Sequence, residues 1–184
     1  MPTIQKDASP RYLKVSTVAD ANGLMDQVRA AALAVRNWIL LTQSCDPLDT
    51  LRRMKYEPVG FHPIDGRPLN LIEQINQTWT YAAALAAARQ LLALHPEAGG
   101  FRVAPGAHAC LELDIMSEIP GIVGAEIFAA VTPRNNGKLE ADLLKLGKRT
   151  EEHRYVFFMC PLFPGIRRLP QFEKHGVQVW SVDI

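Results

Sequence analysis

Two apolar runs of strand-like composition, each carrying one carboxylate, constrain this chain most. The first run covers residues 111–115 and contains Asp114, and the second covers residues 125–131 and contains Glu126. A turn with proline and glycine separates them, so we expect neighbouring strands. A charge inside such a run is costly unless it is paired, and a divalent metal ion would pair it through carboxylate oxygens. The pattern therefore predicts two carboxylates close together in a β-rich core.

The bulk composition sets the size of the fold and the kind of partner. The chain has 184 residues, of which 48% are hydrophobic, so we expect one domain, or one domain with an appended lobe, around a well-buried core. Lysine and arginine number 20 against 19 acidic residues, which leaves a formal charge of +1. Such a balance gives no overall attraction to nucleic acid or to an anionic membrane. Any nucleic-acid contact must therefore come from a local patch.

Cysteine usage and hydropathy indicate a cytoplasmic protein. The three cysteines, Cys45, Cys110 and Cys160, are far apart and form no C-x-x-C pair, which favours a reducing compartment. The N-terminus lacks the apolar segment of a secretory signal, and no run approaches the roughly 18 apolar residues of a membrane span. We therefore expect a soluble, cytoplasmic chain with no membrane partner.

The first part of the chain, residues 1–69, is predicted to form an N-terminal helical lobe. Apolar residues recur at helical spacing over residues 22–42. Asp46 could cap a second, short helix over residues 47–54. Residues 56–70 contain three prolines and two glycines and are expected to be a loop or a short-strand connector.

Residues 70–184 show a regular order of elements and are predicted to form an α/β core with a mixed central sheet. Asn70 can cap a long, alanine-rich helix over residues 71–94, which His95-Pro96 would end. Small side chains would let this helix lie close against a sheet. A helix over residues 137–148 is expected to link two parallel strands. The strands are predicted at residues 101–103, 109–115, 124–132, 155–160 and 177–182.

This order, α-β-β-β-α-β, with Asp114 and Glu126 twelve residues apart, resembles the core of the PD-(D/E)XK nuclease superfamily, which has the restriction-endonuclease-like fold. The resemblance extends over roughly residues 70–184. It implies that Asp114 and Glu126 bind one or two Mg²⁺ (or Mn²⁺) ions and that Glu73 supplies an auxiliary carboxylate. It also implies a metal-dependent phosphodiesterase that acts on nucleic acid.

One position departs from the family's motif. The family has a lysine two residues after the second carboxylate, where this chain has Phe128. A phenyl ring can neither orient the attacking water nor stabilise charge on the phosphate. Lys138 could take the migrated position at the start of the next helix, with Arg134 four residues before it. Alternatively, the site is degenerate, and the chain is an inactive nuclease-fold protein that acts as a binding or regulatory module, with a homodimer through the N-terminal lobe.

Further acidic residues have two interpretations each. Glu73, Gln77 and Thr80 fall along one helix face and would suit metal-water or phosphate binding, although Glu73 could simply favour the helix N-terminus. Glu112 lies two residues before Asp114, so it is either a third acidic ligand or part of a half-exposed polar face. A small-molecule enzyme with an unrelated pocket also remains open.

Histidines and basic residues complete the candidates. The five histidines show no H-x-x-x-H or H-x-H spacing, so a zinc site built from local sequence is not predicted, although His108 could approach Asp114. The polar turn at residues 132–138 could hold a phosphate but lacks the spacing of a nucleotide-binding P-loop. A phosphate-backbone patch could form from Lys145, Lys148, Arg149, Arg167 and Arg168.

Overall fold

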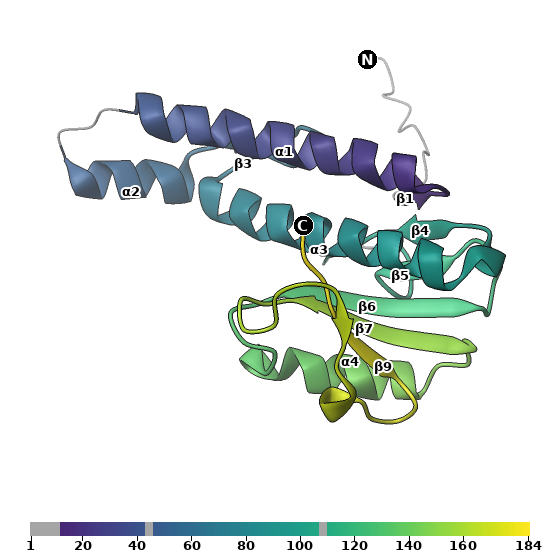
Figure 1. Cartoon of the computed structure of the whole chain (residues 1–184). Coiled ribbons are helices and arrows are strands. Elements are labelled where there is room, and N and C mark those ends of the chain that lie inside the picture. The colour runs from purple at the N-terminus through teal and green to yellow at the C-terminus, as the bar shows by residue number, and fades with distance from the viewer. Residues whose placement is uncertain (1–11, 43–45, 107–109) are drawn as a thin grey trace, which may run out of the picture.

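The computed structural model describes residues 12–42, 46–106 and 110–184, and within these ranges the protein has an α/β fold (Figure 1). The α-helices of these ranges are α1 (Val18–Leu41), α2 (Pro47–Tyr56), α3 (Leu71–Leu94) and α4 (Lys138–Gly147). Short 3₁₀ turns, η1 (Pro96–Ala98), η2 (Asn135–Gly137) and η3 (Pro170–Phe172), connect elements. Across the described residues, no helix is long and apolar enough to cross a membrane.

The main sheet is mixed and has seven strands. Its order is β1-β4-β5-β6-β7-β9-β8, in which β6, β7 and β9 run parallel and the other pairs are antiparallel. A separate two-stranded sheet pairs β2 (Gly60–Phe61) with β3 (Pro68–Leu69). The main strands are β1 (Leu13–Val15), β4 (Phe101–Val103), β5 (Ile115–Ser117), β6 (Val123–Ala129), β7 (His153–Met159), β8 (Arg167–Arg168) and β9 (Gln178–Ser181). The predicted α/β class with a mixed sheet is confirmed.

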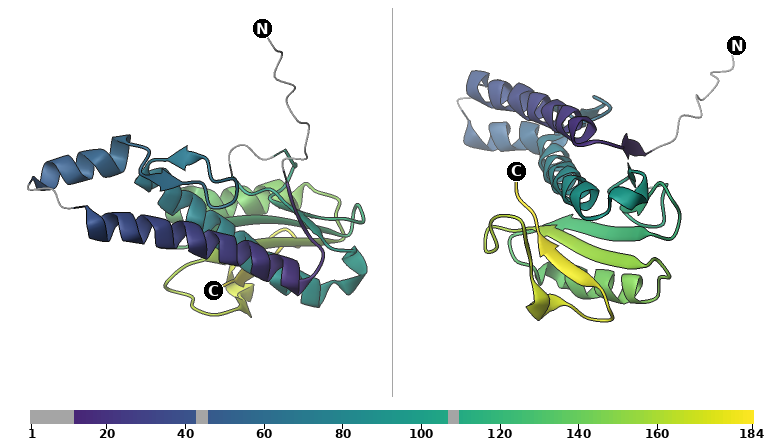
Figure 2. Two further views of the ribbon diagram at one scale, coloured as in Figure 1. Left: turned by 90° about the horizontal axis from the view of Figure 1, so that it is seen from above. Right: turned by 45° about the vertical axis from the view of Figure 1, so that its right-hand side comes forward.

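Helices cover both faces of the sheet. In the right-hand view of Figure 2, α3 lies between α1 and the sheet, and α4 lies on the opposite face. Strand β6 shows the consequence of this layering, because its side chains alternate between the two faces. Ala125 and Ile127 belong to the core between the sheet and α3, the α3-side core, whereas Phe128 belongs to the core between the sheet and α4, the α4-side core. Glu126 alternates with Ile127 and therefore faces α4.

Helix α3 follows its local signals closely. The side-chain Oδ1 of Asn70 accepts a hydrogen bond from the Glu73 N–H at 2.9 Å, and the helix ends at His95, as predicted. Its buried alanines, Ala82–Ala84 and Ala86–Ala88, pack in the same core as β4, β6 and β7. Small side chains at these positions let the helix axis lie close to the sheet.

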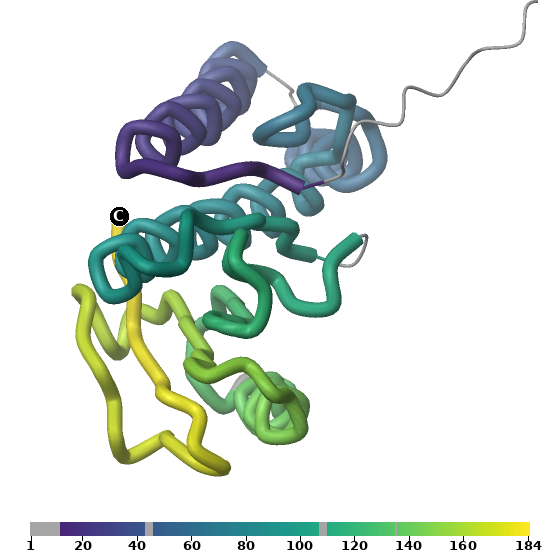
Figure 3. The backbone as a smooth tube through the Cα atoms, turned by 90° about the vertical axis from the view of Figure 1, so that its right-hand side faces the viewer, coloured from purple at the N-terminus to yellow at the C-terminus, as the bar shows by residue number. Residues whose placement is uncertain are grey.

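The N-terminal part of the chain shares this core. Strand β1 pairs with β4, and Val15, Met25 and Val28 belong to the core cluster that contains α3. In the tube view of Figure 3, the purple helix α1 lies alongside the teal helix α3. Thr17 forms a capping box with Asp20 at the start of α1. Strand β1 was not predicted, because three residues give too short a pattern to recognise.

Buried polar contacts hold the segment between α1 and α3. The buried side-chain amide of Gln74 accepts from the Phe61 N–H at 2.6 Å and donates to the Ala31 carbonyl at 2.9 Å. It thereby joins α3 to β2 and α1. Asp46 caps α2 as predicted, since its Oδ1 accepts from the Leu48 N–H at 3.0 Å.

One predicted strand is wrong over most of its length. The expectation was a strand at residues 109–115, but β5 begins only at Ile115, and residue 109 lies outside the described residues. Leu113 is buried in the α4-side core, whereas Ile115 is buried in the α3-side core. Two residues that share a strand would share a face at this spacing. The backbone therefore turns between Leu113 and Ile115, and this turn determines where Asp114 lies. The other predicted elements are found with bounds shifted by up to four residues.

Candidate functional site

Five charged residues gather between β6 and α4, and we call them the carboxylate–lysine cluster: Asp114, Glu126, Lys138, Asp142 and Lys145. Glu126 comes from the middle of β6, and Asp114 directly precedes β5, the strand beside it. The other three come from α4, four and then three residues apart. That spacing puts them on one helix face. The face is turned toward Glu126 because α4 packs on that side of the sheet.

Short contacts tie the members together. Lys145 Nζ donates to Glu126 Oε1 at 2.5 Å. Lys138 Nζ donates to Asp142 Oδ1 at 2.6 Å and lies 3.8 Å from Glu126 Oε2. Asp114 Oδ2 accepts from the backbone N–H of Ile127 at 2.9 Å. Both Glu126 oxygens therefore have a lysine as neighbour, and Asp114 is fixed against β6.

Burial shifts the titration of the cluster. Burial first, and then the nearby Glu126 charge, raise the pKa of Asp114 to about 7, against the opposing effect of the Ile127 hydrogen bond. Burial also raises the pKa of Asp142 to about 6. For Lys138, burial alone would lower the pKa, but the hydrogen bond and charge of Asp142 together with the charge of Glu126 raise it above its usual value. Asp114 therefore exchanges its proton near neutral pH.

The cluster offers oxygen ligands of the kind that a hard divalent cation takes, but its three carboxylates do not bring one oxygen each within 4.8 Å of one another. Three carboxylates face two ammonium groups, so the fully ionised cluster has one uncompensated negative charge. Oδ2 of Asp142 is buried and has no hydrogen-bond partner among the described residues. Carboxylate oxygens are the ligands that Mg²⁺ and Mn²⁺ prefer. A cation held by two of these carboxylates would offset the excess negative charge.

The structure brings together three of the four residues expected at the site, namely Asp114, Glu126 and Lys138. Glu73 is the exception, because it lies on α3, which covers the opposite face of the sheet from the Glu126 side chain. Glu73 is exposed at the first turn of its helix, where a carboxylate favours the helix dipole. Asp142 was not predicted, and Lys145 was expected only in a phosphate-backbone patch, although the spacing of both from Lys138 could have indicated them.

Two further positions bear on the sequence expectations. Phe128 is buried in the α4-side core and stacks on Phe158, with ring centroids 5.6 Å apart. Glu112 pairs with Arg149, which also binds Glu151 at 2.5 Å, so Glu112 has a partner outside the cluster. His108 and Cys45 lie outside the described residues.

The residues considered for a basic patch are largely engaged with acids. Arg168 binds Glu173 at 2.7 Å, and Lys145 belongs to the carboxylate–lysine cluster. Arg167 lies over the ring of Phe163, 5.7 Å from its centroid. These contacts lower the net positive charge that the patch offers to a phosphate backbone.

A cleft of about 580 Å³ lies where β6 and β7 end, on the side of α3. Trp79 and Asn76 of α3 line it together with Met159 and Asp183. Ligands of α/β proteins commonly bind outside the carboxyl ends of parallel strands. This cleft is where a small molecule would bind under the alternative that the chain is a small-molecule enzyme.

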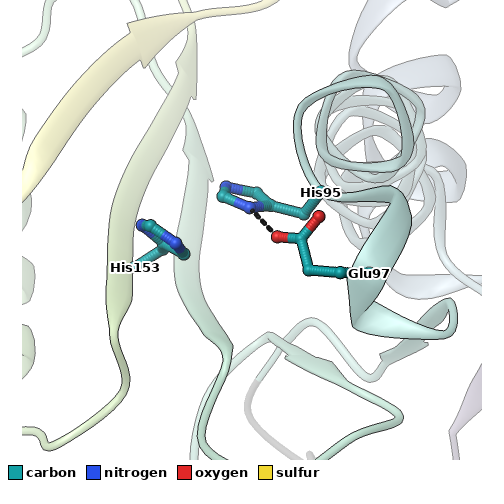
Figure 4. Close-up of side chains that lie close together, drawn as sticks. All are labelled: His95, Glu97 and His153. Carbon is teal, nitrogen blue, oxygen red and sulfur yellow. Dashed lines mark hydrogen bonds and ion pairs between the residues drawn. The ribbon is translucent and has the colours of Figure 1, made fainter.

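A second group of potential ligands lies at the other end of β7. In Figure 4, His95, Glu97 and His153 come together from the end of α3, from η1 and from the start of β7. Across residues 12–42, 46–106 and 110–184, these are the only three His, Cys, Asp or Glu residues whose ligand atoms all lie within 4.8 Å of one another. The sequence gives no local signal for this group, because His153 follows His95 only 58 positions later.

The fold and the carboxylate–lysine cluster together define an α/β protein with a mixed sheet and a buried charged site between β6 and α4. Searches of protein-family models, curated proteins and solved structures find no match to this chain. The function is therefore argued from the site itself.

Proposed function

We propose that this protein is a metal-dependent phosphodiesterase of nuclease type that acts on nucleic acid. The observation that carries the proposal is the meeting of Asp114, Glu126 and Lys138 at one place between β6 and α4. The element order α3-β4-β5-β6-α4-β7, with β4 to β7 adjacent in the sheet, supports it. This order is the one that the PD-(D/E)XK resemblance implies.

The roles follow from the chemistry of each side chain. Asp114 and Glu126 would hold Mg²⁺ or Mn²⁺, which when bound supplies Lewis acidity and lowers the pKa of a bound water. Lys138 would neutralise charge on the phosphate, and Asp142 holds it in place through the 2.6 Å hydrogen bond. Lys145 supplies a second cation beside Glu126. Glu73 has no part in this proposal.

The two lysines of the site are more exposed to solvent than its carboxylate Glu126. The side chains of Lys138 and Lys145 are 45% and 48% exposed, whereas that of Glu126 is 4% exposed. The two ammonium groups therefore stand between the buried carboxylate and solvent. A phosphate that approaches from solvent meets positive charge first, in spite of the near-neutral charge of the whole chain.

Metal binding is the first test, because it precedes every version of the mechanism. Calorimetry with Mg²⁺, which prefers oxygen ligands, is expected to show binding to the wild type and its loss when Asp114→Asn and Glu126→Gln are combined. Both substitutions keep the side-chain shape, and circular dichroism checks the fold. Glu73→Gln, on the opposite face of the sheet, is the matched control and should bind like the wild type. A folded wild type that takes up no Mg²⁺ at about millimolar concentration overturns the proposal.

Activity is the second test. Cleavage of single- and double-stranded DNA and RNA is expected with Mn²⁺ and is expected to fall on the order of 100-fold in Lys138→Met, since one preorganised charge is commonly worth that much. Metal binding should persist in this variant. Metal binding without cleavage of any of these substrates would refute the catalytic part of the proposal.

A second candidate is a binding or regulatory role without catalysis. Phe128 favours it, because the motif lysine is replaced by a residue that stacks in the core. Exposed apolar side chains on α1 and α2, including Leu40, Leu41, Leu48 and Leu51, also suit a partner such as a second copy of the chain. Sedimentation would then show a dimer that Leu41→Glu weakens, while Mg²⁺ binding is absent.

A further inference from the structure

The group at the start of β7 has the composition of a transition-metal site. His95 Nδ1 and Glu97 Oε1 lie 2.8 Å apart, and the ring centroids of His95 and His153 lie 4.3 Å apart with a tilt of 32° (Figure 4). Two imidazoles and one carboxylate form a nitrogen–nitrogen–oxygen donor set. This set matches the three protein ligands of open Zn²⁺ sites.

A neighbouring phenol already orients one ring. His95 Nε2 lies 2.6 Å from Tyr155 Oη, and the His95 side chain is only 7% exposed. Tyr155 is two residues after His153 on β7, so both side chains leave the strand on the same face. Metal-binding histidines typically make such a contact through the second nitrogen. With a metal on Nδ1, the Nε2–H of His95 would donate to Tyr155 Oη.

We propose that His95, Glu97 and His153 bind one divalent transition-metal ion, with Zn²⁺ as the best fit. The ligands would be Nδ1 of His95, one carboxylate oxygen of Glu97 and one ring nitrogen of His153. A tetrahedral zinc site with bonds near 2.0–2.1 Å has its ligands about 3.3 Å apart. The present atoms lie within 4.8 Å of one another, so a modest rotation of side chains completes the site.

The proposed metal site is open to solvent and also has a buried ligand. The side chains of Glu97 and His153 are 51% and 35% exposed, so an ion can reach them from solvent. The buried His95 side chain holds the inner side of the site in place. Water would take the fourth position. Bound metal would tie the end of α3 and η1 to β7, which lies far from them in the sequence. The site is independent of the carboxylate–lysine cluster, because Tyr155 belongs to the α3-side core.

The test uses the full-length chain without a histidine tag, stripped with EDTA and dialysed. Titration with Zn²⁺ by calorimetry, and with Co²⁺ by visible absorption, should show one site per chain with nitrogen-containing coordination. Glu97→Gln and His153→Gln should each weaken binding at least tenfold, since even outer-shell changes typically cost 10–100-fold. Both residues are partly exposed, so these variants should fold. Tyr155→Phe tests a positioning residue and should weaken binding about tenfold while the cobalt spectrum is kept.

Two controls make the outcome specific. His175→Asn removes an exposed imidazole elsewhere, and asparagine tolerates the positive φ of 56° at that position. The combined Asp114→Asn and Glu126→Gln variant removes the other candidate metal site. Both controls should bind Zn²⁺ like the wild type. Absence of a one-to-one site in the folded wild type, or unchanged affinity in His153→Gln, overturns the proposal.

Discussion

Replacing Asp114 with asparagine should change how the stability of the protein depends on pH. Burial raises the pKa of Asp114 from 3.8 to about 7. Between these values the native state holds more protons than the unfolded state, so the free energy of unfolding falls as pH rises. The loss is complete above the folded pKa. The asparagine side chain is neutral throughout, so the variant lacks this loss, and its amide oxygen can still accept from the Ile127 N–H.

The magnitude follows from the size of the shift. A change from 3.8 to about 7 is roughly three pKa units, and each unit corresponds to about 1.4 kcal/mol, which gives about 4 kcal/mol in total. The wild type has already lost part of this free energy of unfolding at about pH 4.5. The free energy of unfolding of Asp114→Asn relative to the wild type should therefore rise by about 3 kcal/mol between about pH 4.5 and 8.5. The raised pKa of Lys138 adds nothing here, since its effect begins only above its ordinary value of 10.5.

Urea unfolding with EDTA, followed by tryptophan fluorescence at both pH values, measures this difference. The control is Asp26→Asn, which removes an exposed carboxylate on α1 that pairs with Arg29 at 3.0 Å. Its difference from the wild type should stay within about 0.5 kcal/mol at both pH values. An Asp114→Asn advantage that is the same at both pH values would refute the argument that a buried charge destabilises this site.

Three further substitutions test the packing. Lys145→Met should destabilise the protein by about 1–2 kcal/mol in urea unfolding, because Glu126 loses its closest cation, at 2.5 Å, although the lysine is half exposed; equal stability would show that this pair is not formed. Gly60→Ala should cost about 1–3 kcal/mol, since the new Cβ would lie 2.2 Å from the buried Gln74 Oε1, and an unchanged urea midpoint would contradict that contact. Gly23→Ala, which meets nothing within 4 Å inside α1, should raise stability by about 0.5–1 kcal/mol, and a lower melting temperature would contradict its helical placement.

Elements with strong local signals could be predicted from the sequence. Helix α3 begins after its Asn70 cap and ends before Pro96, as predicted, because caps and proline act within a few residues. The parallel pairing of β6 with β7 around α4 also followed from the order of elements. Strand β8 was missed because two residues carry no periodicity. The strand predicted over residues 111–114 failed for another reason, because Leu113 packs in the α4-side core whereas Ile115 packs in the α3-side core.

Part of the candidate site could also be predicted from the order of the elements. That order gives neighbouring strands followed by a returning helix, and this arrangement places Asp114, Glu126 and Lys138 near one another. The position of Glu73 could not be predicted, because the face of the sheet that α3 covers is set by packing across the whole chain. The meeting of His95 with His153 likewise depends on tertiary structure alone.

The two ends of the main sheet also affect how copies of this chain meet. The outermost strands, β1 and β8, have only three and two residues. They carry exposed cations, Lys14 on β1 and Arg167 and Arg168 on β8. Short edges with charged side chains present few unpaired backbone groups to a foreign strand. The longer, apolar strands β6 and β7 lie inside the sheet, so the segments with the greatest tendency to form amyloid-like stacks are shielded in the native state.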